Sequence, residues 1–120
     1  MADQALTELT VADLSKRIAS KELSPVDVVE AFIERTEATE SKLNAWITRL
    51  PDQARAAAKQ AESEITAGNY KGPLHGVPIG LKDLFWTKGV RTTSGSVITK
   101  DFVPDEDATV VAKLQDAGAF

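Results

Sequence analysis

The sequence predicts an α/β protein in which a helical first half of about 70 residues is followed by a strand, a loop and a helix. Three observations lead to this prediction. Apolar residues recur at helical spacing through the first half, a short apolar run at 77–81 is bounded by Gly and Pro, and a last helix is followed by two apolar residues. At 120 residues, we expect a single domain with a leading helical segment (1–70) and the beginning of an α/β core (71–120).

Two N-capping patterns mark the first helices. Thr10 followed by Asp13 is an acidic form of the capping box. It predicts a helix whose buried face contains Val11, Leu14 and Ile18.

Ser24 and Pro25 mark the second helix start, with Asp27 in the first turn. This helix has an apolar stripe made of Val28, Val29, Phe32, Ile33 and Thr36. Its glutamates are expected to face water, as charges on helices usually do; they are Glu30, Glu34, Glu37 and Glu40.

The β-branched and aromatic residues of 43–50 predict a short strand, with Trp46 as a core anchor. A third helix, rich in alanine, is expected to begin at Pro51 and to run to about Ala67, where Gly68 stops it. Its narrow face of small residues, which suits close packing, consists of Ala54, Ala57, Ala58, Ala61 and Ile65.

Composition argues against several classes of function. The chain has no cysteine and a single histidine, so we expect no disulfide, no metal site and no cofactor. No apolar run approaches the roughly 20 residues of a membrane span, and the first residues do not resemble a signal peptide, so a cytoplasmic setting is expected. The net charge of −4 arises from the first 70 residues, and without a basic stripe we expect no direct nucleic-acid partner.

The most distinctive stretch is 72–83, which reads Gly-Pro-Leu-His-Gly-Val-Pro-Ile-Gly-Leu-Lys-Asp. Residues 77–81 predict a short buried strand that Pro78 restricts to an edge, a bulge or its first residues. Lys82 at its end is either a surface cation or a functional amine held in the interior, and the residues alone favour the surface cation. Strand alternation sends Asp83 to the other face, where we expect it to bond backbone in the following loop.

Turns and a final helix follow. A Lys-Gly turn interrupts the apolar cluster of 84–90, and the residues at 92–96, Thr-Thr-Ser-Gly-Ser, are typical of turns and caps. A helix is predicted over 108–117, with Asp107 as N-cap and Gly118 as the stop; its buried face contains Val110, Val111 and Leu114. Since 119–120 look like the beginning of a core strand, we expect the chain to be the front part of a larger α/β protein.

Taken in order, these segments resemble the amidase signature family, and the resemblance covers nearly the whole chain. The segments that carry it are 23–27 (Leu-Ser-Pro-Val-Asp), 43–46 (Leu-Asn-Ala-Trp), 72–83, 92–96, 102–104 (Phe-Val-Pro), 107–111 (Asp-Ala-Thr-Val-Val) and 117–119 (Ala-Gly-Ala). The resemblance implies a mixed sheet covered by helices. It also implies hydrolysis of a small-molecule carboxamide to a carboxylate and ammonia by a Ser–cis-Ser–Lys triad.

On this resemblance Lys82 is the catalytic residue of the family's lysine block. It would be the general base, accepting a proton from a bridging serine that relays it from the nucleophilic serine. That role requires a neutral amine, whereas a free lysine has a pKa near 10.4. Burial at the end of an apolar strand, and a hydroxyl that donates to the amine, would favour the neutral form.

The chain departs from the family in lacking the Gly/Ser-rich segment that carries both serines and the oxyanion-binding N–H groups. Ser94 and Ser96 lie close after Lys82, but no oxyanion hole accompanies them, so we do not expect either to be the nucleophile. We therefore expect these 120 residues to be inactive alone and to need a missing C-terminal part or a partner chain. Two alternatives remain: the glutamine-amide-using subunit of a tRNA-dependent amidotransferase, and a truncated, non-catalytic binding paralogue.

Overall fold

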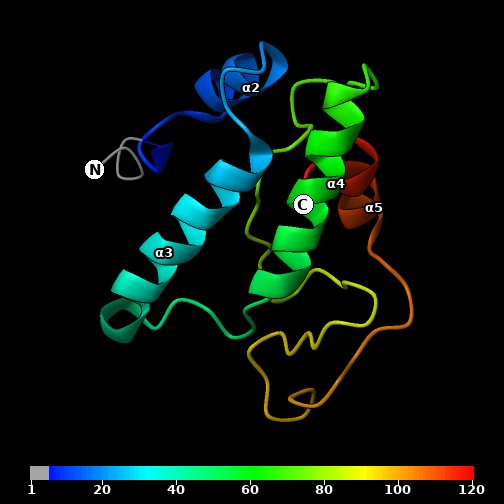
Figure 1. The fold of residues 1–120 in the computed structure, drawn as a ribbon. Helices are drawn as coiled ribbons and strands as arrows, with labels where there is room; N and C mark the ends of the chain where they lie inside the picture. Colours follow the sequence, from blue (N-terminus) through cyan, green and yellow to red (C-terminus); the bar gives the residue numbers. More distant parts are fainter. Residues whose placement is uncertain (1–5) are drawn as a thin grey trace.

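The computed structural model describes residues 6–120, and its organised part is helical (Figure 1). The helices with described bounds are α2 (Val11–Ala19), α3 (Pro25–Leu43), α4 (Pro51–Thr66) and α5 (Thr109–Asp116). A long irregular segment connects α4 to α5 and carries the stretch 72–83. Every helix in the described residues is too short or too polar to cross a membrane.

The two predicted N-caps are confirmed. Thr10 Oγ1 accepts the N–H of Asp13 at 3.1 Å, and Ser24 Oγ accepts the N–H of Val26 at 2.9 Å. The Ser24 hydroxyl also donates to Glu62 Oε1 on α4 at 2.5 Å, so this cap joins two helices. The predicted buried face of α2 is wrong at Val11, which is 53% exposed because it lies at the first position of the helix.

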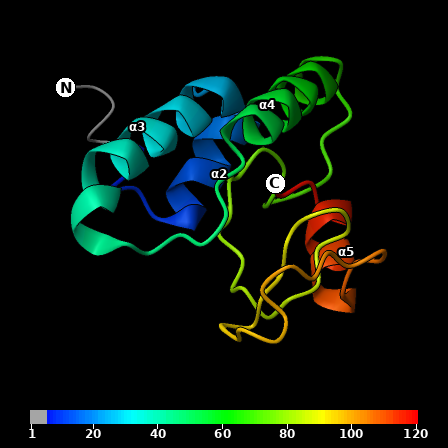
Figure 2. The ribbon, with the colours of Figure 1, turned by 90° about the horizontal axis from the view of Figure 1, so that it is seen from below.

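Helices α3 and α4 pack side by side (Figure 2). One apolar cluster joins α2, α3, α4 and the irregular segment; it consists of Leu14, Ile18, Val28, Ile65 and Val77. Arg55 on α4 donates to both carboxylate oxygens of Glu30 on α3, at 2.7 and 3.0 Å, so Glu30 faces the neighbouring helix as well as solvent. The small-residue face of α4 is confirmed as a packing face, since Ala58, Ala61 and Ile65 are buried.

The predicted strand at 43–50 is wrong. Helix α3 continues to Leu43, Asn44 takes a left-handed φ of 47°, and the following residues are irregular. The Glu40 carboxylate accepts the backbone N–H groups of Ala45 and Trp46, at 3.2 and 2.9 Å. A side chain therefore satisfies the donors that a neighbouring strand would have bonded, and Trp46, which is 43% exposed, is not a core anchor.

The predicted buried strand at 77–81 is not confirmed, because residues 6–120 contain no assigned strand. Of this stretch only Val77 is buried. The backbone of Phe120 nevertheless lies beside it: its N–H donates to Val77 O at 3.1 Å, and its carbonyl accepts from the N–H of Ile79 at 2.7 Å. Bonds from one residue to two alternate residues follow the pattern of parallel strand pairing. The N–H of Gly76 also donates to Gly118 O at 3.0 Å, but these few bonds are too short a ladder for a strand to be assigned within residues 6–120.

Helix α5 begins one residue later than predicted, with Ala108 as N-cap in place of Asp107. Asp107 instead accepts the N–H of Lys88 at 2.7 Å, which fastens the Lys-Gly turn to the start of the helix. Val111 is buried as predicted, whereas Val110 is 40% exposed. Gly118, with a φ of 87°, follows the end of the helix.

Candidate functional site

The backbone around Lys82 is held from both sides. Upstream, Gly80 lies against the Trp46 ring, where an added Cβ would be 3.0 Å from the nearest ring carbon. Downstream, Lys82 O accepts the N–H of Phe85 at 3.0 Å, and Asp83 O accepts the N–H of Ser94 at 2.8 Å. The lysine therefore projects from a fixed point of the chain.

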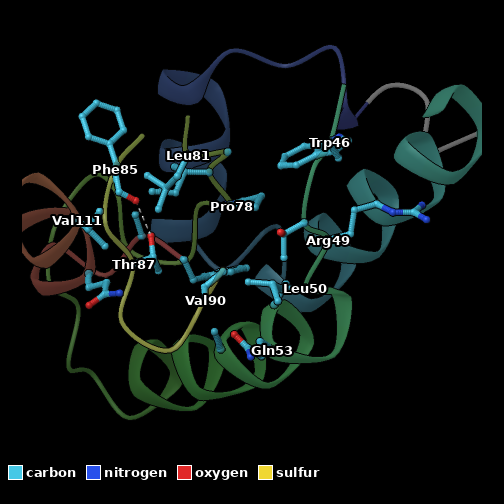
Figure 3. A pocket seen from close by; sticks show the side chains of 18 of the residues that line it. Trp46, Arg49, Leu50, Gln53, Pro78, Leu81, Phe85, Thr87, Val90 and Val111 are labelled. Carbon is cyan, nitrogen blue, oxygen red and sulfur yellow. Dashed lines mark hydrogen bonds between the residues drawn. The ribbon is translucent and has the colours of Figure 1, made fainter. Parts of the chain in front are cut away.

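The Lys82 side chain itself is exposed, as the residues alone predicted, whereas the family role implied a buried amine. It borders a groove of about 1450 Å³ between the α3–α4 pair and the irregular segment. Figure 3 shows Trp46 and Leu50 of the α3–α4 connection bordering the same space as Leu81, Phe85 and other residues of the irregular segment. Within 6–120 no hydrogen bond or ion pair reaches the Lys82 amine. The reason for its exposure is that the stretch before it forms no buried strand.

Asp83 is bonded to the following loop, as predicted. Its carboxylate accepts the N–H of Thr93 at 2.9 Å, the hydroxyl of Thr93, and the N–H of Gly95 at 3.4 Å. These bonds, that of the Thr93 hydroxyl above all, hold the pKa of Asp83 below its usual range. Ser94 and Gly95 have φ of 52° and 67°, and Ser96 donates its N–H to Thr93 O at 2.9 Å. This is a tight turn of the kind in which both central residues have positive φ.

Ser94 and Ser96 have local roles in that turn, as the sequence predicted. The Ser94 N–H donates to Asp83 O, and Ser96 Oγ accepts the N–H of Ile98 at 3.2 Å.

The described residues contain no group of three or more His, Asp or Glu side chains placed to hold a metal ion.

A second polar cluster, which sequence reasoning missed, surrounds His75. His75 is 1% exposed; its Nδ1 accepts the N–H of Lys71 at 3.1 Å, and its Nε2 lies 2.9 Å from Glu64 Oε2. Because Nδ1 accepts, Nε2 carries a proton that it donates to Glu64. The same carboxylate pairs with Lys71 Nζ at 2.9 Å. Hydrogen bonds from Lys71 and then Gln60 lower the pKa of Glu64 to about 2. The only signal in the sequence was a lone histidine between glycines and prolines.

Comparison with known proteins identifies the family of this chain. The family profile described as Amidase matches residues 27–120. The chain belongs to the amidase family. A glutamyl-tRNA(Gln) amidotransferase subunit of Geobacter sulfurreducens is 51% identical over 114 residues, a match that covers 95% of this chain and 23% of that protein.

Solved amidase structures have the same fold over this region. The peptide amidase of Stenotrophomonas maltophilia superposes with a TM-score of 0.85 at 37% identity, over 93% of this chain and 23% of that one. A fatty acid amide hydrolase superposes with a TM-score of 0.92 at 30% identity, over 98% of this chain and 21% of that one. The described residues thus adopt part of the amidase-signature fold, and the chain spans about a quarter of the length of these relatives.

Proposed function

We propose that this amidase-family chain contributes the general base, Lys82, to a site that hydrolyses a carboxamide to a carboxylate and ammonia. The single observation that carries the proposal is an amine without a partner in the described residues, bordering a groove and attached to a backbone that is fixed on both sides. Family membership supports the reaction class. Residues 71–120 would be the beginning of the catalytic core, and residues 1–70 would be its leading segment within one domain.

In this proposal the two serines of a Ser–cis-Ser–Lys triad come from outside the 120 residues. Lys82 as a neutral amine takes a proton from the bridging serine, which takes one from the nucleophilic serine. The nucleophile's oxygen then bonds to the carboxamide carbon, and the C–N bond breaks as the nitrogen receives the proton held by Lys82 and leaves as ammonia. Water then bonds to the acyl carbon, the ester C–O bond to the nucleophilic serine breaks, and the serine regains a proton as the carboxylate leaves.

A second function is favoured by the 51% identity to a glutamyl-tRNA(Gln) amidotransferase subunit. In that case the amide is the side chain of glutamine, and the ammonia is passed on within a complex with other subunits. A truncated binding paralogue without catalysis is the third possibility. The substrates separate them: release of ammonia from a simple carboxamide without partners supports the hydrolase, and release from glutamine that depends on added partner chains supports the amidotransferase.

The test compares Lys82 variants in the complete protein, with ammonia release as the measurement. Lys82→Ala and Lys82→Arg should each lower kcat by at least about 100-fold. Alanine has no amine, and arginine keeps the charge but cannot accept a proton. Lys88→Ala, at another exposed lysine, is the matched control and should keep its rate. Full activity in Lys82→Arg would refute the role of Lys82.

The isolated 120-residue chain is the second arm and should release no ammonia. Hydrolysis by this chain that is lost on replacing Ser94 or Ser96 would overturn the proposal that the nucleophile lies elsewhere.

A further inference from the structure

Asp83, which follows Lys82 in the sequence, makes hydrogen bonds that the proposed chemistry does not itself require. A carboxylate beside a base lysine would stabilise the protonated amine and so oppose its function. In the described residues no ion pair joins Asp83 to Lys82, and the hydrogen bonds of the carboxylate go to residues 93–95. The Asp83 carboxylate is thus bonded to the loop at 93–95, about ten residues further along the chain.

That loop is itself well anchored. Thr93 is 5% exposed, and its carbonyl accepts the Ser96 N–H and the Thr99 hydroxyl. Its hydroxyl donates to Asp83 and accepts the N–H of Gly95 at 3.1 Å. Since the Asp83 carbonyl also accepts the N–H of Ser94, main chain and side chain of Asp83 are bonded to the same turn.

We propose that Asp83 and Thr93 form a clamp that positions Lys82, by fixing the backbone from which the amine projects. The inference rests on the proposed function of Lys82 as general base. Asp83 is then a positioning residue, because it acts through its neighbour and has no contact with substrate.

The physical reason for a clamp is the length of the lysine side chain. Lys has four rotatable side-chain bonds, so its amine sweeps a large volume if its Cα moves as well. A general base must lie about 2.6–3.2 Å from the proton donor, and a displacement of about 1 Å in a catalytic group can cost on the order of 100-fold in rate. Four bonds from Asp83 to one turn remove backbone motion and leave only the rotamer choice.

The test separates the hydroxyl of Thr93 from its methyl group. Thr93→Val keeps the shape and removes the bond to Asp83, whereas Thr93→Ser keeps the bond and removes the methyl. In the complete protein, Thr93→Val should lower kcat by about tenfold or more with KM changed by no more than about twofold, since a misplaced base affects chemistry and not substrate binding. Thr93→Ser should keep kcat within about twofold. A role in packing alone predicts the reverse order of the two variants.

The outcomes identify which proposal fails. If Lys82→Arg is active, the proposed function fails and the clamp fails with it. If Lys82→Arg is inactive but Thr93→Val keeps its kcat, or Thr93→Ser loses as much as Thr93→Val, the clamp alone is refuted. If Thr93→Val does not fold, Asp83→Asn decides: it keeps the volume but turns an amide N–H₂ toward the donors of Thr93 and Gly95, and full kcat in this variant refutes the clamp.

Discussion

Gly118 is the residue at which the structure makes its sharpest prediction about stability. Its φ is 87°, and a Cβ added there would lie 2.6 Å from His75 Cδ2 and 2.9 Å from both His75 Cα and Cγ. His75 cannot move aside, because its ring is held by Lys71 and Glu64. Gly118→Ala should therefore suffer both backbone strain and steric overlap.

The two costs can be estimated separately. A left-handed φ costs a non-glycine residue about 1–2 kcal/mol, and overpacking a buried site costs about 1–3 kcal/mol. The expected loss of unfolding free energy for Gly118→Ala is the total of these, about 2–5 kcal/mol. Gly68 provides the matched control, since its φ is 89° and no atom lies within 4 Å of its added Cβ. Gly68→Ala should show only the backbone cost.

Urea unfolding followed by far-ultraviolet circular dichroism measures both variants against the parent protein. The difference between Gly118→Ala and Gly68→Ala should be about 1–3 kcal/mol, which is the overlap with His75 alone. In a double-mutant cycle Gly118→Ala should cost less in a His75→Ala background than in the parent, because the ring contacts are then absent while the contact with the backbone Cα remains. Equal destabilisation by the two glycine variants would show that the reasoning about His75 is wrong.

Two further predictions concern the helical half. The pKa of Glu64 is lowered to about 2 by its bonds, with Lys71 the largest cause, so its stabilising contribution is complete above the ordinary value of 4.5 and is lost as pH falls through about 2. The gap in melting temperature between the parent and Glu64→Gln should therefore close over this range in a pH series, and a gap that stays constant would contradict the ion pair. Ser24→Ala should lower the unfolding free energy by about 0.5–2 kcal/mol. The loss should exceed the loss for Thr10→Ala, because the Thr10 side chain bonds only within its own helix whereas Ser24 also bonds Glu62 on α4. Equal losses in urea titrations would show that the bond to Glu62 adds no stability.

Features that depend on neighbours in sequence were predicted well. The caps at Thr10 and Ser24 and the stop at Gly68 need only a few adjacent residues, and the structure has all three. The predicted strands at 43–50 and 77–81 failed because a strand needs a partner from elsewhere in the chain. At 43–50 the Glu40 side chain accepts the backbone N–H groups, and at 77–81 the backbone bonds to 118–120 are too few for a strand to be assigned.

The same distinction holds at the candidate site. The sequence marked Lys82 through its motif, and the prediction that Asp83 bonds the following loop is correct, although the strand alternation on which it rested is not present in the structure. The sequence did not identify Thr93 as the partner, or Glu64 as the partner of His75, because each pair is joined across a loop whose path no local pattern determines. The residues alone predicted an exposed Lys82, and the buried amine that the family role implied depended on a strand at 77–81 that is not assigned.

The helical half has a physical role in the candidate site that its own residues do not reveal. Val77, five residues before Lys82, is buried in the cluster formed by α2, α3 and α4. At Gly76 an added Cβ would lie 2.8 Å from Pro25 Cγ, so the start of α3 sits directly against the stretch that leads to the lysine. Burying a valine side chain contributes about 1.5–3 kcal/mol. The helices thus fix the backbone upstream of Lys82, and the bonds of Asp83 fix the backbone downstream of it. A substitution in either place would move the Lys82 amine without contacting it.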